Sequence, residues 1–153
     1  MTVAITSDLV GQILRDAAAS PHREICGLLF GGPDAVTAIR ACRNVAADPA
    51  RWFEIDPAAL IAAHRAARGG GPALVGHYHS HPSGVVRPSP RDAASAPPDG
   101  ALWLIAAGGE LRGWRAVAAG AIEGRFDPVA LRHDPPCAYP APSPHQASLS
   151  RGT

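Results

Sequence analysis

The chain has 153 residues, of which 46% are apolar, and a formal net charge of +1. This length predicts one domain with a buried core, and the near-zero charge gives no electrostatic basis for binding nucleic acid or anionic lipid. No apolar run approaches the roughly 18 residues of a membrane span. The N-terminus lacks a basic stretch followed by an apolar one, and the three cysteines form no Cys-x-x-Cys pair. We therefore expect a cytoplasmic protein.

Hydrophobic periodicity together with Gly and Pro stops predicts two helices and six strands. In chain order these are a helix (6–20), two strands (25–30 and 35–42), a second helix (56–69) and four strands (73–79, 101–107, 111–118 and 122–126). The fold class expected from this order is α/β, a single domain in which helices flank a largely antiparallel mixed sheet.

The composition changes at Pro128. The segment from there to the end is rich in Pro and Ser and nearly free of large aliphatic residues, a composition typical of disorder. We therefore divide the chain into a folded domain, residues 1–127, and a disordered tail, residues 128–153. The tail is expected to be dispensable for catalysis.

Two histidines and one aspartate form the most informative pattern in the sequence. His79 and His81 are two residues apart at the end of a predicted strand, and Asp92 follows a Pro-rich loop. Side chains two residues apart on a strand point to the same face, so these two imidazoles can reach one ion and the carboxylate can supply a third ligand. Three protein ligands with one open position are typical of a hydrolytic zinc site.

This region resembles the JAMM motif of the MPN+ (Mov34/PAD-1) metalloproteases. That motif is an upstream Glu, then His-x-His-Pro, six residues, Ser, two residues and Asp. Here it is met without substitution by Glu24, residues 79–82, Ser89 and Asp92. The resemblance covers roughly residues 3–126, is closest to the small stand-alone bacterial type, and implies a cytidine-deaminase-like architecture.

The resemblance also implies a role for each motif residue. His79, His81 and Asp92 are the expected ligands of one Zn²⁺. Glu24 is expected to hold and deprotonate the attacking water, and the Ser89 hydroxyl to support the developing oxyanion. These roles agree with elementary chemistry, since zinc lowers the pKa of a bound water toward neutrality and a nearby carboxylate can accept the proton.

Simpler interpretations exist for several of these residues. Ser89 can cap a short helix beginning near Pro90, a role compatible with the catalytic one. Glu24 considered alone is an ordinary polar residue at the start of a strand. His77 shares the strand face of the ligands and is expected beside them rather than among them. Cys26 has no base to pair with and is interpreted as a small buried hydrophobe.

By resemblance, the reaction is hydrolysis of a peptide or isopeptide bond after the C-terminal glycines of a ubiquitin-like β-grasp protein. Two substrate classes stay open: sulfur-carrier proteins with C-terminal extensions or adducts, which the compact chain favours, and conjugates of a bacterial ubiquitin-like modifier. The motif also allows a RadC-like protein or a non-catalytic MPN scaffold. RadC-type proteins usually carry a helix-hairpin-helix region that this chain lacks, and degenerate scaffolds lose ligands that this chain keeps. Whether the protein forms a homodimer is left open.

Overall fold

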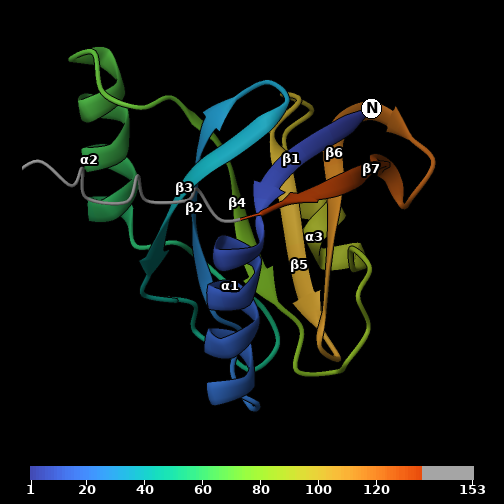
Figure 1. Ribbon diagram of the computed structural model, residues 1–153. Coiled ribbons are helices and arrows are strands. Elements are labelled where there is room, and N and C mark those ends of the chain that lie inside the picture. Colours follow the sequence, from blue (N-terminus) through green and yellow to red (C-terminus); the bar gives the residue numbers. More distant parts are fainter. Residues whose placement is uncertain (136–153) are drawn as a thin grey trace, which may run out of the picture.

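The computed structural model describes residues 1–135. Within this range, seven strands close into a barrel in the order β1-β3-β2-β4-β5-β6-β7, accompanied by three helices (Figure 1). The elements are β1 (Thr2–Thr6), α1 (Ser7–Ala19), β2 (Cys26–Gly32), β3 (Ala35–Cys42), α2 (Pro57–Arg68), β4 (Leu74–Ser80), α3 (Pro90–Ser95), β5 (Leu102–Ala107), β6 (Glu110–Gly120) and β7 (Gly124–Asp134). The expected α/β fold is confirmed. The sequence did not predict that its sheet closes into a barrel.

The sheet contains both antiparallel and parallel strand pairings. Neighbouring strands are antiparallel in β2–β3, β2–β4, β5–β6 and β6–β7. They are parallel in β1–β3, β1–β7 and β4–β5. The sheet is therefore mixed with an antiparallel majority, as expected.

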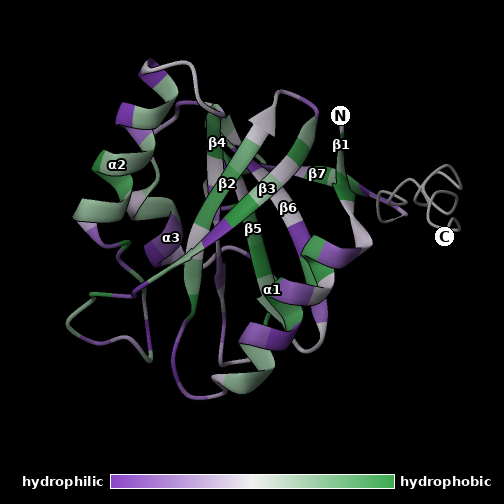
Figure 2. Cartoon of the chain, turned by 60° about the vertical axis from the view of Figure 1, so that its left-hand side comes forward, coloured by the Kyte–Doolittle hydropathy of each residue, from purple (hydrophilic) through white to green (hydrophobic). Residues whose placement is uncertain are grey.

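The two longer helices begin where their capping residues predict. The Thr6 hydroxyl accepts a hydrogen bond from the Leu9 amide (3.3 Å) at the start of α1, and the Asp56 carboxylate accepts one from the Ala58 amide (3.0 Å) at the start of α2. Figure 1 shows α2 standing beside the barrel, and Figure 2 shows apolar and polar residues alternating along both helices. No helix within residues 1–135 has the length and apolarity needed to cross a membrane.

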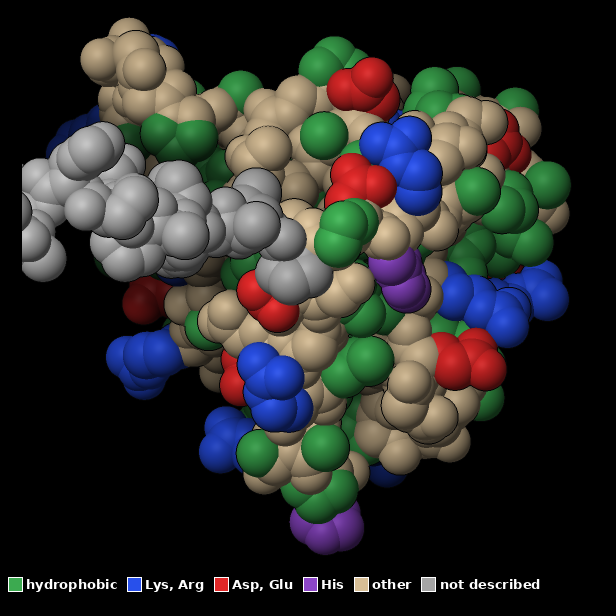
Figure 3. All heavy atoms as spheres, viewed as in Figure 1, with side chains coloured by type: hydrophobic (Ala, Val, Ile, Leu, Met, Phe, Trp, Pro, Cys, Tyr) green, Lys and Arg blue, Asp and Glu red, His purple; other side chains and the backbone are tan. Residues whose placement is uncertain are grey.

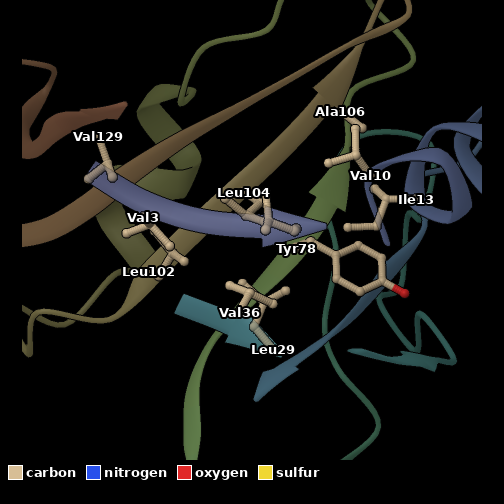
Figure 4. Close-up of a cluster of buried hydrophobic side chains, with 11 residues drawn as sticks. Val3, Val10, Ile13, Leu29, Val36, Tyr78, Leu102, Leu104, Ala106 and Val129 are labelled. Carbon is tan, nitrogen blue, oxygen red and sulfur yellow. The ribbon is translucent and has the colours of Figure 1, made fainter. Parts of the chain in front are cut away.

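Strand β5 is buried on both faces and separates two hydrophobic clusters. Leu102 and Leu104 belong to the cluster shown in Figure 4, which also contains side chains from β1, β4 and α1. Trp103 and Ile105 point the other way, into a second cluster. The neighbouring strand β4 alternates in the same manner, so Tyr78 enters the first cluster and its neighbours on either side face the opposite way.

Strand β1 was not among the predicted elements. Its alternating sequence, with Val3 and Ile5 both 1% exposed, is the signal that predicts a half-buried strand. Residues 2–6 pair in parallel with residues 130–134 of β7 and so close the barrel.

The domain boundary expected at residue 127 therefore falls inside β7, and the expectation of disorder is wrong for residues 128–134. The Pro- and Ser-rich composition suggested a break at Pro128, a residue that cannot donate a ladder hydrogen bond. In the structure it pairs with Trp114 of β6, two residues before the pairing with β1 begins at Ala130. The remainder of the expected tail, residues 136–153, lies outside the described residues.

The last predicted strand, residues 122–126, is interrupted by a turn. The Arg125 amide donates to the Ile122 carbonyl (3.0 Å), and the two central residues, Glu123 and Gly124, have φ angles of 51° and 65°. Strand β7 begins only at Gly124. The prediction missed the turn because Glu is an unusual residue in such a conformation.

Candidate metal centre

Three side chains from β4, the loop after it and α3 converge on one point. The Nε2 atoms of His79 and His81 are 3.0 Å apart. The carboxylate of Asp92 contacts both, with Oδ1 at 3.2 Å from His79 Nε2 and Oδ2 at 3.1 Å from His81 Nε2. The structure thus brings together all three residues that were expected to bind the metal.

The spacing of these donors fits a zinc ion. With zinc–ligand distances of about 2.0–2.2 Å, neighbouring ligands of a tetrahedral site lie roughly 3.4 Å apart. The observed separations are slightly shorter, so a small outward shift of the side chains accommodates the ion. The Nδ1 atom of His81 lies 2.8 Å from the Val85 carbonyl. Donation to that carbonyl leaves a lone pair on Nε2, as metal binding requires.

The charge states of His79 and Asp92 suit a metal. Burial lowers the pKa of His79, so its imidazole is neutral at pH 7. Burial opposes ionisation of Asp92, but its hydrogen bonds with His79 and His81 outweigh this effect and hold the pKa of Asp92 below its usual range. Neutral imidazoles and an ionised carboxylate are the forms that ligate zinc. Burial opposes protonation of His81, but its hydrogen bonds with Asp92 and the Val85 carbonyl outweigh this effect and raise its pKa, so metal binding there displaces a proton.

A capping box at the start of α3 fixes the Asp92 carboxylate. The Ser89 hydroxyl accepts a hydrogen bond from the Asp92 amide (3.0 Å), while Asp92 Oδ2 accepts one from the Ser89 amide (2.9 Å). The Ser-x-x-Asp spacing of the motif is therefore also the spacing of a helix N-terminus, and the capping role of Ser89 is confirmed. The hydroxyl proton of Ser89 is not used by this cap.

Glu24 precedes β2 and is buried beside the histidines. Its side chain is 5% exposed, and one carboxylate oxygen lies within 4.8 Å of donor nitrogens of both His79 and His81. Its Oε1 atom has no hydrogen-bond partner within the described part of the chain. Burial raises the pKa of Glu24 to about 7, although the nearby His81 opposes the rise. A pKa near neutrality is suited to a general base.

Asn44 organises the backbone around Glu24, a role that the sequence did not predict. Its Nδ2 donates to the carbonyls of Glu24 (2.9 Å) and Trp52 (3.0 Å). Its Oδ1 accepts from the amides of Ala46 (3.0 Å) and Glu54 (3.1 Å). No local pattern marks this residue, because its four partners are two to twenty positions away.

Aromatic packing holds the His79 ring. Phe53 stacks on it with ring centroids 4.2 Å apart and an angle of 22° between the planes. His77 instead packs edge-on against Trp103 at 4.1 Å, and its ring centroid is 6.5 Å from that of His79. His77 therefore lies beside the donor triangle rather than within it, as expected.

An open groove of about 470 Å³ leads to the centre. It is bordered by Glu24, Ala50, Arg51, His81, Pro82, Ser83, Val85, Arg87, Pro88, Ser89 and Glu123. A larger cavity of about 720 Å³ lies beside α2 and reaches His77, but none of the three donor residues lines it. On the face shown in Figure 3, acidic and basic side chains are interspersed rather than separated by sign.

A His-His-Asp donor set next to a buried carboxylate, at the end of an open groove, has the composition typical of a hydrolytic metal site. The chain belongs to the prokaryotic homologues of the JAB domain, whose family model matches residues 6–119. This membership confirms the resemblance to the JAMM/MPN proteins and their fold.

Individual relatives agree with this assignment. A protein of Haloferax volcanii named desampylase is 41% identical over 91 residues, which span 58% of this chain and 66% of that protein, slightly less than two thirds. A Pyrococcus furiosus desampylase is 32% identical over 114 residues, 74% of this chain and 80% of that protein. A Thermus thermophilus protein, named a probable TtuB-protein conjugate cleaving protease, is 38% identical over 68 residues, 44% of this chain and 46% of that protein.

Solved structures share the fold. A Desulfitobacterium hafniense protein superposes with a TM-score of 0.68 at 24% identity, covering 89% of this chain and 96% of that one. A JAB1/MPN domain protein from Archaeoglobus fulgidus gives a TM-score of 0.55 at 18% identity, covering 86% of this chain and 98% of that one.

Proposed function

We propose that this protein is a zinc-dependent isopeptidase that releases a ubiquitin-like β-grasp protein from its conjugates by cutting after the C-terminal glycines. The observation that carries the proposal is the donor triangle of His79, His81 and Asp92 beside the buried carboxylate of Glu24. The names of the relatives support conjugates as the substrate class, since one of them is named for cleaving a protein conjugate.

Each residue of the centre has a distinct task in this reaction. His79, His81 and Asp92 would hold one Zn²⁺, which when bound acidifies a water and polarises the scissile carbonyl. Glu24 accepts the proton of the attacking water and delivers it to the leaving amine. The Ser89 hydroxyl donates a hydrogen bond to the carbonyl oxygen as negative charge develops there, an effect often worth roughly 3 kcal/mol per donor.

The groove suits an extended substrate tail. Glycines next to the scissile bond allow the backbone to approach the centre closely, because they carry no side chain. Selectivity should therefore depend on the glycines and on the folded body of the ubiquitin-like protein.

A sulfur-carrier protein with a C-terminal extension is the second candidate substrate, because the same chemistry cuts a peptide bond after two glycines. A non-catalytic scaffold role is disfavoured by the intact donor set. We also propose a cytoplasmic location, which the free thiols of Cys26 and Cys42 support.

Three substrates test this function. The first is a β-grasp protein ending in Gly-Gly, joined by an isopeptide bond to a lysine peptide. The second is the same protein extended by a short linear peptide, and the third is that peptide alone with its two glycines. We expect cleavage after the second glycine in the two folded substrates and very slow cleavage of the third. The ratio of the first two rates shows whether isopeptide conjugates or linear C-terminal extensions are the better substrates. Equal rates for the free peptide would indicate a general peptidase and contradict the proposal.

A further inference from the structure

The turn between β6 and β7 holds a glutamate in a left-handed backbone conformation. Its four residues run from Ile122 to Arg125 and are closed by the hydrogen bond from the Arg125 amide to the Ile122 carbonyl (3.0 Å). Positive φ angles at both central residues, 51° at Glu123 and 65° at Gly124, define a type I′ turn.

Glu is a poor choice for this turn. The first central position of a type I′ turn favours Asn, Asp or Gly, because other side chains are strained at positive φ. Glu123 is the one non-glycine residue with a positive φ within residues 1–135. Strain of this kind persists where function requires the side chain, so the location of Glu123 becomes informative.

Glu123 borders the groove that leads to the metal centre. Apart from Glu24, which is committed to proton transfer, it is the acidic residue on the border of this groove. Of the two arginines there, Arg51 already lies 3.6 Å from Asp48. Glu123 itself is exposed, and no ion pair within 4.0 Å involves it in the described part of the chain. Its carboxylate is thus available to a substrate.

We propose that Glu123 is a specificity residue that binds a lysine or arginine side chain flanking the scissile bond. The inference rests on the proposed function, since it needs a substrate lying in this groove. The cation can come from the tail of the ubiquitin-like protein, before its two glycines, or from the acceptor segment next to the modified lysine. Both sources present the same chemistry to the carboxylate.

Matched conjugates distinguish these sources. Two carry Arg or Glu immediately before the Gly-Gly of the β-grasp protein, and two carry Arg or Glu beside the modified lysine of the acceptor peptide. The readout is relative kcat/KM when the members of a pair compete in one reaction. We expect the wild type to prefer Arg over Glu roughly two- to fivefold in one pair, the range of a single exposed charge pair.

Three variants separate recognition from turn structure. Glu123→Gln keeps the strain and removes the charge, whereas Glu123→Asn removes the charge and suits the turn. Both should lose the preference, although only Glu123→Asn should raise the midpoint of thermal unfolding. Glu123→Arg should invert the preference. Asp34→Asn, which removes an exposed carboxylate from a hairpin turn that does not border the groove, should change nothing.

The outcomes are distinct. A preference that disappears in both neutral variants and inverts in Glu123→Arg supports the inference. Equal rates within both pairs for the wild type, or a preference that survives in Glu123→Gln, overturn it while leaving the proposed function intact. Failure of the wild type to cleave any of the four conjugates overturns the proposed function and this inference with it.

Discussion

Ser80, the last residue of β4, and Ile25, which immediately precedes β2, are joined by two hydrogen bonds. The Ile25 amide donates to the Ser80 hydroxyl (2.9 Å), and the Ser80 amide donates to the Ile25 carbonyl (3.1 Å). Ser80 lies between His79 and His81 in the sequence, and Ile25 follows Glu24. This pair therefore sets the position of the expected base relative to the metal ligands.

Replacing Ser80 with alanine should impair the reaction more than metal binding. The Ile25 amide loses its partner in a partly buried position, which should destabilise the fold by about 1 kcal/mol. Displacement of Glu24 should lower kcat/KM by roughly ten- to a hundredfold, while the bound zinc stays at one equivalent. Urea unfolding, steady-state kinetics and metal analysis measure the three effects. The control is Ser7→Ala, which removes an exposed hydroxyl whose hydrogen bond goes to the Asp134 carbonyl and not to the metal centre. Loss of zinc in Ser80→Ala would show that the residue supports the ligands instead.

Asn44→Ala should also impair the reaction by displacing Glu24. It removes two hydrogen bonds that the side chain donates, to the carbonyls of Glu24 and Trp52, and two that it accepts within residues 44–54. We expect kcat/KM to fall at least roughly tenfold and the loop to become more accessible to protease. Limited proteolysis with mass spectrometry locates the new cleavage sites. Unchanged kinetics would mean that the remaining contacts of Glu24 suffice to position it.

The stability of the metal-free protein should depend on pH through Glu24. Burial raises the pKa of Glu24 from 4.5 to about 7, so between these values the folded state retains a proton that the unfolded state has released. Stability contributed by the protonated form is present below about pH 4.5 and is lost as pH rises through 7. Glu24→Gln stays neutral, so it should be more stable than the wild type at pH 8 and similar to it at pH 4.

Urea unfolding in the presence of a chelator, at both pH values, measures this difference. Glu110→Gln, which changes an exposed carboxylate, should unfold like the wild type at pH 8. With zinc present, Glu24→Gln should retain the metal and lose nearly all activity, because Gln cannot accept a proton. A Glu24→Gln variant with near-normal turnover would assign the base to another residue.

Two truncated proteins should show how much of the chain beyond Asp127 the fold requires. A protein ending at Asp127 loses residues 130–134, which pair with β1, so the barrel cannot close and the protein should unfold or aggregate. A protein ending at Pro135 keeps every described strand and should retain its zinc and activity. Circular dichroism and metal analysis of the two proteins provide the test. A folded, active protein ending at Asp127 would show that the β1–β7 pairing is not required.

The metal centre was predictable because its residues obey local rules. His79 and His81 follow the two-residue period of a strand, and Ser89 and Asp92 follow the spacing of a capping box. Each period brings its own pair of residues together, and the intervening loop brings the two pairs to one place. Glu24 was located by resemblance alone, since its approach to the histidines depends on the β2–β4 pairing.

The features that escaped prediction depend on contacts distant in sequence. Parallel pairing of β1 with β7 joins residues more than a hundred positions apart. The Pro- and Ser-rich composition after Pro128 also concealed the second half of β7. The contacts of Asn44 and Phe53 arise only when the loop before α2 folds over β4. The contacts of Asn44 and Phe53 leave no periodic signal in the sequence, whereas β1 has an alternating pattern that does not reveal its distant partner.

Zinc reconstitution tests the central claim most directly. Metal-stripped protein is titrated with Zn²⁺ while cleavage of the β-grasp isopeptide conjugate is followed. The rate should rise from near zero and reach its plateau at one equivalent, whereas a His79→Ala/His81→Ala protein should stay inactive throughout the titration. Full cleavage by the stripped protein, or by the histidine variant, would contradict the assignment of a zinc isopeptidase to this site.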